Sequence, residues 1–523
     1  MDITPTRQEY QLLSEELVIG LDSSTQSTKA IAWNREGKAI AEGRADIPMA
    51  NPQLDFYEQQ SGHWWQAAVN AIAQCTAQID GASVKGLAIS NQRETLAFLD
   101  EDDQDTRPAI LWLDERSREQ VKTFASSFGS DRIHAITGRR PDTTSCLYTF
   151  AWLREQQPDI YQRTAKFVDV QSYLVKQLCG GEYRTGWISA DPMGIVDMVK
   201  HEWSRELMNA LDLDDSRLSS IHPPGTRLGT LTDEVANLLN LPQLTPVFAA
   251  GGDGQCAGLG VNCTVPDRAY INLGTAVVSG IWSKEYRYND AWRTELAAQG
   301  EGYILENCLR SGAFLINWFV DQFVAHGKAT QTDFDKLEHA ASALPIGAEG
   351  LLVQPYFGGS MDPHWDSSAR GIIMGLGASH SPAHIYRALL EGITLDQAMR
   401  TQDMEAAAGQ TISHLVAIGG GANSKLWTHM LADACGKPVH ISTTLEASAL
   451  GAGMIAAYGT GWYDTITEAA NAMSGETSVI EPDPINHQRY QALLGIYRKI
   501  YQSTREINHE LMAFSASSES GIQ

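Results

Sequence analysis

Two adjacent side chains of opposite charge, Arg93 and Glu94, stand where a buried segment of the chain ends. Residues 87–89 are apolar and predict a buried strand, residues 90–95 form a polar tip, and a second apolar run begins at Leu96. A guanidinium donates hydrogen bonds in a fixed fork and a carboxylate accepts them, so the pair matches the hydroxyl groups of a polyol. The alternative is a local ion pair at a strand end.

A second candidate is Asp253, which follows the apolar run 245–250 and two glycines, Gly251 and Gly252. Glycines let a backbone or a ligand approach closely. A carboxylate on this turn, at the end of a strand and the start of a helix, is positioned to accept a proton. The alternative is an aspartate that only caps the helix.

A third candidate site lies near the N-terminus, where Asp22 ends a predicted strand over 17–22. A hydroxyl-rich turn, residues 23–28, leads to Lys29 and a second apolar run. Such a turn gathers N–H and O–H donors at one point, which suits a phosphate, with Lys29 as countercharge and Asp22 able to hold a hydrated Mg²⁺. The alternative is a plain polar hairpin.

The same pattern returns in the second half of the chain. Residues 269–281 predict a strand, a turn at Gly274 and Thr275, and another strand. Their likeness to residues 17–33 indicates a weak internal repeat at a separation of about 250 residues. The repeat predicts two related domains, each with one phosphate-binding turn, and a boundary near residues 261–268.

A glycine-rich turn, Gly419–Gly421, connects a predicted strand over 415–418 to a helix over 425–436. It is a plausible nucleotide cradle at a helix N-terminus, although it lacks the Walker lysine and the GxGxxG spacing. A last helix, over 447–459, contains two glycines that let an adenine or another helix pack close.

A further predicted strand, 108–111, ends in Trp112, Asp114 and Arg116. Successive strands that end in charged and aromatic groups indicate one site at neighbouring strand ends, the usual ligand position in α/β folds. The two tryptophans of a predicted helix over 61–79 are better explained by helix–sheet packing than by a cofactor site.

The composition sets outer limits. A chain of 523 residues exceeds the usual size of one core, so two domains are expected. A net charge of −24 argues against a nucleic-acid partner. Seven scattered cysteines lack metal-site spacing and indicate reduced thiols. Residues 1–16 form a polar leader without the features of a secretion signal, and no run is apolar enough to span a membrane, so a cytoplasmic location is expected.

Together these stretches resemble the FGGY family of carbohydrate kinases, over about residues 17–510. The most specific piece is residues 371–391, GIIMGLGASHSPAHIYRALLE, which fits the C-terminal signature of the family. Residues 91–95, NQRET, look like the substrate strand of glycerol kinases, whereas residues 418–427, IGGGANSKLW, look like xylulokinases.

The resemblance implies an α/β fold of two ribonuclease H-like domains, of the actin/hexokinase type, with a central cleft. The N-terminal domain, 15–264, would hold the substrate strand, the first phosphate loop and the catalytic aspartate. The C-terminal domain, 265–511, would bind the nucleotide, and residues 512–523 are expected to form a disordered tail.

The resemblance also implies phosphorylation of a sugar or polyol hydroxyl with ATP and Mg²⁺. Asp253 would be the general base, and Asp22 and Asp253 would lie by the metal. The residues implied at the two substrates are Arg93, Glu94, Trp112, Asp253 and Gly254 for the sugar or polyol, and Thr25, Lys29, Gly274, Thr275, Gly420, Gly421 and Asn423 for ATP.

Two departures bear on the substrate. Glycerol kinases carry a tyrosine at the place of Thr144 and a glutamine at the place of Gly254, so we expect a larger pocket and a four- to six-carbon ketose or alditol. A glycerol kinase is the alternative, because Arg93 and Glu94 replace the Met–His pair of xylulokinases. A second alternative is an inactive sugar-sensing protein of the same fold. A homodimer and closure of the two domains around both substrates are expected.

Overall fold

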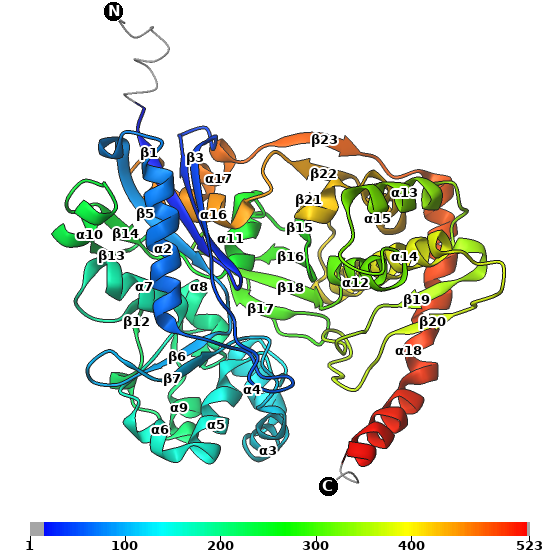
Figure 1. The fold of residues 1–523 in the computed structure, drawn as a ribbon, viewed down its shortest axis with the longest axis horizontal. Helices are drawn as coiled ribbons and strands as arrows, with labels where there is room; N and C mark the ends of the chain where they lie inside the picture. Colours follow the sequence, from blue (N-terminus) through cyan, green and yellow to red (C-terminus); the bar gives the residue numbers. More distant parts are fainter. Residues whose placement is uncertain (1–14, 520–523) are drawn as a thin grey trace, which may run out of the picture.

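The structure, a computed structural model, describes residues 15–519, and two large β-sheets dominate it, one from each half of the chain (Figure 1). Residues 1–14, which make up most of the expected polar leader, and residues 520–523 lie outside the described residues. All seven cysteines are free thiols, as expected. Within the described residues, no helix is both long and apolar enough to cross a membrane.

The N-terminal sheet contains the first predicted hairpin. β1 pairs antiparallel with β2 and parallel with β5, which places Ile19 beside Leu87. Every residue of β1 is buried, as expected for a strand covered on both faces. In spatial order the strands are β13 (Arg227–Thr230), β14 (Pro246–Phe248), β5 (Val84–Asn91), β1 (Leu17–Ser23), β2 (Ser27–Trp33) and β3 (Ala39–Asp46). The helices α2 (Ser61–Thr76), α7 (Val170–Cys179) and α10 (Asp233–Leu238) pack on one face.

The C-terminal sheet repeats this plan. β15 and β16 form the second predicted hairpin, and β15 also pairs in parallel with β21, just as β1 pairs with β5. In spatial order the strands are β17 (Arg293–Leu296), β18 (Tyr303–Leu309), β16 (Val277–Ser283), β15 (Arg268–Leu273), β21 (His414–Ile418), β22 (Val439–Ser442) and β23 (Glu476–Ile480). The shared plan confirms the predicted architecture of two ribonuclease H-like domains.

Three helices cross between the halves. α11 (Asp253–Gly260) follows the N-terminal sheet, but its residue Ala257 packs with Tyr270 of the C-terminal sheet. α16 (Ala447–Gly459) and α17 (Ile466–Met473) come between β22 and β23 of the C-terminal sheet in the chain, but they cover the open face of the N-terminal sheet (orange beside blue in Figure 1). α11 and α16 touch at Gly451, where a Cβ would lie 2.0 Å from the Cys256 carbonyl oxygen.

The other face of the C-terminal sheet is covered by a layer of long helices, which the sequence predicted only in part. These are α12 (Ala313–Phe323), α13 (Gln331–Ser342), α14 (Pro382–Ala408), α15 (Lys425–Cys435) and α18 (Pro484–Glu519). The helix over 447–459 is therefore not the last one. α18 also continues through residues 512–519, which were expected to be disordered.

A smaller unit beside the N-terminal sheet corrects the prediction of neighbouring strand ends. β7 (Asp105–Ile110) does not lie next to β5; it pairs antiparallel with β6 (Leu96–Leu99) in a separate four-stranded sheet. The chain reverses its direction after β5, which allows β6 and β7 to pair. The ends of β5 and β7 therefore do not meet at one edge of a parallel sheet. The unit also contains β4 (Glu58–Gln59), β8 (Lys166–Val168), α3 (Arg118–Phe128), α4 (Ser130–Thr137), α5 (Cys146–Gln156), α6 (Pro158–Arg163) and α9 (Arg205–Leu211).

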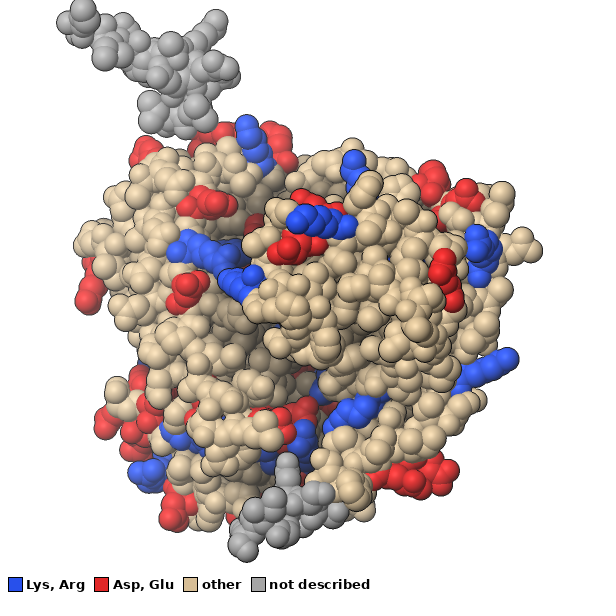
Figure 2. All heavy atoms as spheres, turned by 45° about the vertical axis from the view of Figure 1, so that its right-hand side comes forward, with Lys and Arg blue, Asp and Glu red and all other residues tan. Residues whose placement is uncertain are grey.

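Short elements complete the chain. They are β9 (Arg184–Gly186), α8 (Trp187–Ala190), β10 (Val196–Asp197), β11 (Glu202–Trp203), β12 (Ser220–His222), β19 (Leu352–Gln354) and β20 (Ile372–Met374). On the face shown in Figure 2, acidic and basic side chains are scattered among other residues.

Candidate active site

Asp253 is the first residue of α11, at the junction of the two sheets. Gly251, two residues before Asp253, has φ of 157°, and a Cβ there would lie 2.4 Å from the Ser189 nitrogen. This turn therefore requires glycine. The helix N-cap is Gly252, and the Asp253 carboxylate accepts a 2.8 Å hydrogen bond from the Gly254 N–H. Asp253 is thus not the N-cap, and 37% of its side chain is exposed.

Arg93 lies directly against Asp253. The chain after β5 is held beside the end of β1, because the Gln92 N–H donates to the Ser23 carbonyl at 2.9 Å. From there Arg93 Nε reaches to 3.1 Å from Asp253 Oδ1, and its Nη1 donates to Glu295 at 2.6 Å. The predicted substrate strand and the predicted base therefore meet at one point.

Arg93 and Glu94 each pair with distant residues instead of with each other. They belong to a buried arginine–glutamate cluster, made of Arg93, Glu94, Arg139, Arg293, Glu295 and Glu306. Within it Glu94 accepts from Arg139 at 2.8 Å and from Arg293 at 3.0 Å. All six side chains are less than 10% exposed. The local ion pair considered as the alternative is not formed, and the cluster joins the two halves.

The sequence analysis missed the other four members of this cluster. Glu295 and Glu306 lie within β17 and β18, whose residues are all buried, and a charge inside an apolar strand such as β18 is a usable signal. Arg139 stands in the turn after α4, where nothing in the local sequence indicates a buried ion pair. Arg293 gave no separate signal, because it begins its strand.

Opposite charges decide the protonation of the cluster and of Asp253. Burial raises the pKa of Glu306, but Arg93 and Arg293 outweigh it and lower that pKa to about 2. The pKa of Asp253 is raised by burial, lowered in part by Arg93, and raised again by Glu94. A raised pKa makes the Asp253 carboxylate a stronger base.

Asp22, at the end of β1, is the second carboxylate beside Asp253. It is buried, and its Oδ1 accepts a 2.8 Å hydrogen bond from Ser90 Oγ. Burial and the charge of Asp253 raise the pKa of Asp22 to about 7, against the opposing effects of Ser90 and Lys29. The carboxylates of Asp22 and Asp253 repel each other, and the nearby cations do not fully compensate their charge. Their oxygen atoms form a donor set that suits Mg²⁺. The residues present therefore fit the metal that the resemblance implies.

Lys29, on β2, has a partner that the sequence analysis did not single out. Its Nζ donates to Glu446 Oε1 at 2.6 Å. Glu446 is the N-cap residue of α16, and two residues later Ser448 Oγ donates to the Asp253 carbonyl at 3.0 Å. The crossing helix α16 thus brings its N-terminal end to the predicted first phosphate loop.

Trp112 lies at the same hairpin turn. Its indole Nε1 donates to Thr25 Oγ1 at 2.9 Å, and both side chains are half-buried. The described contacts thus join Trp112 to the first phosphate loop and give it no direct contact with Arg93. Its role at the substrate stays a prediction.

The second predicted phosphate turn lies at the tip of the β15–β16 hairpin. The carbonyls of Gly274 and Thr275 accept hydrogen bonds of 2.8 and 2.9 Å from the backbone N–H groups of Ala313 and Gly312, at the start of α12. Thr275 is exposed. The turn is therefore anchored to a helix N-terminus while its hydroxyl faces solvent.

The glycine-rich turn lies next to this hairpin, because β15 and β21 are parallel neighbours. A Cβ on Gly419 would lie 2.4 Å from Asn272 Oδ1, and a Cβ on Gly421 would lie 2.5 Å from the ring of Trp427. In contrast, the space beside Gly420 is open, and Asn423, in the same turn η5 (Gly420–Asn423), is exposed. The predicted nucleotide residues of the C-terminal half are thus gathered at one end of its sheet.

The structure corrects the expectation that Gly254 enlarges the substrate pocket. A Cβ at Gly254 would lie 2.8 Å from the Arg93 guanidinium carbon and 2.8 Å from Glu306 Oε2. The missing side chain makes room for these two buried groups and not for a longer substrate. Thr144 is half-buried, and its N–H donates to Asp142 at 3.0 Å, while Arg310 of the other half pairs with the same carboxylate at 3.0 Å.

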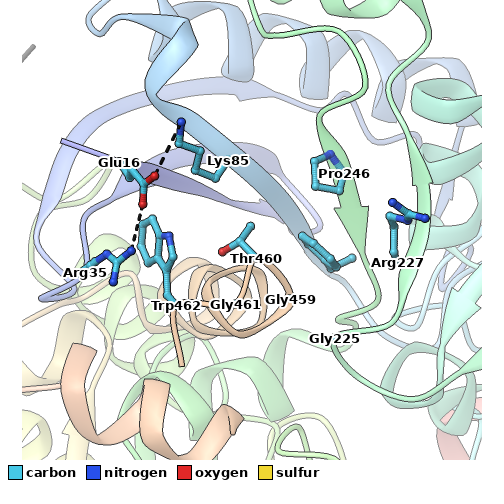
Figure 3. Close-up of a pocket in the computed structure, with 11 residues that line it drawn as sticks. Glu16, Arg35, Lys85, Gly225, Arg227, Pro246, Gly459, Thr460, Gly461 and Trp462 are labelled. Carbon is cyan, nitrogen blue, oxygen red and sulfur yellow. Dashed lines mark hydrogen bonds and ion pairs between the residues drawn. The ribbon is translucent and has the colours of Figure 1, made fainter. Parts of the chain in front are cut away.

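A hollow of about 750 Å³ lies away from this centre, between an edge of the N-terminal sheet and the C-terminal end of α16 (Figure 3). Glu16 pairs there with Arg35 at 3.0 Å and with Lys85 at 3.9 Å, and Arg35 stacks over Trp462. Glu16, Arg35 and Lys85 are thus paired with one another, and none of the residues that line the hollow belongs to the predicted site.

Comparison with known proteins agrees with this geometry. Residues 17–260 match the N-terminal domain of the FGGY family of carbohydrate kinases, and residues 269–460 match its C-terminal domain. Xylulose kinase of Lactococcus lactis is 31% identical over 504 residues, which cover 95% of this chain and 99% of that protein. Xylulose kinase of Bacillus subtilis is 29% identical over 502 residues, with the same coverage.

Among solved structures, gluconate kinase from Lactobacillus acidophilus superimposes with a TM-score of 0.87 at 23% identity, covering 94% of this chain and 98% of that one. At this identity the likeness supports the fold alone. It is consistent with the two-domain architecture described above.

Proposed function

The chain belongs to the FGGY family of carbohydrate kinases and is thus an ATP-dependent kinase of sugar hydroxyls, and we propose that its acceptor is a neutral ketose, with a ketopentose such as xylulose first. The observation that carries this proposal is the charge around Asp253. Arg93, the guanidinium nearest to it, is already paired with glutamates.

The cluster therefore favours an uncharged acceptor. Each of its three guanidiniums lies against at least one carboxylate, and Asp253 adds a further negative charge. A sugar acid would bring another carboxylate into these surroundings without a free cation to meet it. The hydroxyl groups of a ketose need only donors and acceptors, which the edges of the cluster supply.

The proposed chemistry of the chain's own residues begins at Asp253. Its carboxylate accepts the proton of the attacking hydroxyl, and its raised pKa suits that task. Arg93 fixes the orientation of the carboxylate through Nε. Lys29, Thr25, Gly274 and the glycine-rich turn would hold the phosphates and the nucleoside from both halves.

We propose that Asp22 and Asp253 hold the Mg²⁺ that accompanies ATP. When bound, the ion would neutralise the charge that develops on the phosphates. The raised pKa of Asp22 supports this assignment, because a nearby cation would restore its ionised form. Ser90 keeps the carboxylate oriented through its 2.8 Å hydrogen bond.

An ADP-release assay over a panel of acceptors tests the proposal. Xylulose, ribulose, the pentitols, erythritol, glycerol and gluconate would be compared at equal concentrations. We expect the largest kcat/KM with a ketopentose. A preference for gluconate would overturn the charge argument, and a preference for glycerol would support the alternative drawn from Arg93 and Glu94.

The sugar-sensing alternative predicts binding without turnover. ADP release that depends on any acceptor would exclude it. A homodimer and a cytoplasmic location also stay proposals, and light scattering of the purified protein tests the first of them.

A further inference from the structure

Three potential metal ligands lie close together on the C-terminal sheet. They are His414 at the start of β21, His440 on β22 and Glu476 at the start of β23, on three adjacent strands. Gly419 follows the other end of β21, so about 17 Å of strand separates the two ends. The group is therefore remote from the reaction centre.

The three side chains already lie close together. One potential ligand atom from each is within 4.8 Å of those of the other two. The imidazole rings of His414 and His440 are 4.4 Å apart between centroids, and His440 Nδ1 contacts Glu476 Oε2. Within residues 15–519, this is the group of three such side chains that is compact enough to share an ion.

One buried atom of the group has no partner. His414 Nδ1 lies 2.8 Å from Ser413 Oγ, but Nε2 is shielded from solvent and makes no hydrogen bond. A buried polar atom without a partner costs free energy, so its presence needs an explanation. Coordination to a metal would supply the missing partner, while Ser413 would hold the other nitrogen as metal-bound histidines require.

We propose that His414, His440 and Glu476 bind one divalent transition-metal ion of the zinc type. Two imidazoles and one carboxylate form a three-ligand set that leaves a position for water. Tetrahedral zinc places its donor atoms about 3.4 Å apart, whereas the three ligand atoms here lie within 4.8 Å of one another. Side-chain rotations that move these atoms by about 1 Å would complete the site.

Such an ion would fasten the edge of the sheet. β23 is the edge strand and is largely exposed, and it leads into α18. The side chains of His440 and Glu476 are 21% and 26% exposed, which gives an ion access from solvent. The proposed role is therefore structural or regulatory, and it is independent of the substrate and of phosphoryl transfer.

Arg268 competes for the site. Its Nη2 donates to Glu476 Oε1 at 2.6 Å, and its Nε donates to the Val261 carbonyl at 3.0 Å. The guanidinium occupies one carboxylate oxygen and adds a positive charge beside the ion. Removing the guanidinium should therefore strengthen metal binding. If the three residues form only an ion-pair chain of Arg268, Glu476 and His440, the protein should bind no metal ion here with or without Arg268.

Titration of the full-length, chelator-treated protein tests the proposal. Zn²⁺ binding would be followed by calorimetry, and Co²⁺ binding by visible absorption, which reports tetrahedral coordination. We expect one equivalent in the wild type, a loss of affinity of at least about tenfold in His414→Ala and in His440→Ala, and severalfold tighter binding in Arg268→Gln.

Two variants serve as controls. His429→Ala removes an exposed histidine of α15, and Asp22→Asn removes a carboxylate of the proposed magnesium site, so neither should change the stoichiometry of the high-affinity step. The proposal would be overturned if the wild type bound no Zn²⁺, if His414→Ala bound it equally well, or if Arg268→Gln did not bind it more tightly. Melting temperatures of the metal-free variants check that each one folds.

Discussion

Two groups of carboxylates lie side by side at the junction of the sheets and differ in how their charge is balanced. In the arginine–glutamate cluster, Arg93 and Arg293 lower the pKa of Glu306 to about 2, although burial raises that of Glu295. In the aspartate pair, burial and mutual repulsion raise the pKa of Asp22 to about 7.

The difference separates a structural role from a reactive one. The cluster brings its own cations, so it can hold the two halves together without a ligand. The aspartate pair shares Lys29 with Glu446 and Arg93 with the cluster, so its charge stays incompletely compensated. We infer that the pair is completed by ligands, and four experiments can break or sharpen this contrast.

The largest effect is expected from Asp253→Asn, which keeps the shape but removes the base. We expect kcat to fall by about 10²- to 10⁴-fold. Calorimetric affinity for the sugar should change much less. The exposed Asp102→Asn serves as a control with unchanged turnover, and a Asp253→Asn variant with near-normal kcat would exclude Asp253 as the base.

Removing one cation from the arginine–glutamate cluster should lower the free energy of unfolding. Arg293→Gln leaves Glu94 and Glu306 buried with one cation fewer, so we expect the free energy of unfolding in urea to fall by about 3 kcal/mol. The matched control is Arg132→Gln, whose partner Glu206 is exposed, so we expect a much smaller loss. Equal losses in both variants would contradict the structural role of the cluster.

Asp22→Asn should raise the free energy of unfolding instead of lowering it. The folded-state pKa of Asp22 is raised, so its contribution to stability is full below pH 4 and is lost as pH rises toward about 7. We therefore expect the ligand-free variant to be more stable than the wild type at pH 8, by about 2 kcal/mol, but inactive. Urea unfolding at pH 5 and at pH 8 checks that the gain is larger at the higher pH.

The smallest effect is expected at the edge of the pair, from Glu446→Gln. Lys29 loses its partner and becomes available to phosphates, so we expect the KM for ATP to fall by about two- to fivefold, in keeping with a half-exposed ion pair. Steady-state kinetics at two salt concentrations measures the change. A rise in KM would mean that Glu446 positions Lys29 and does not compete for it.

The sequence predicted what local patterns encode. Both hairpins, Asp22 and Asp253 were found because strand, turn and glycine signals lie within a few residues of each other. The partners of Arg93 come from strands far along the chain, and no local pattern announces such a pairing. α18 was missed although Asp483, before Pro484, caps its first turn, a signal that was available.

The crossing of α11 and α16 has a consequence for how the protein is made. A ribosome releases the N-terminal sheet long before α16 and α17, which cover its open face, have been synthesised. Until then, apolar residues such as Val18 and Ala88 would stay exposed to the cell, and the first half could not finish folding by itself. Nascent chains of this protein should therefore be substrates for chaperones, and a gene split between the sheets should give two soluble halves only when both are produced together.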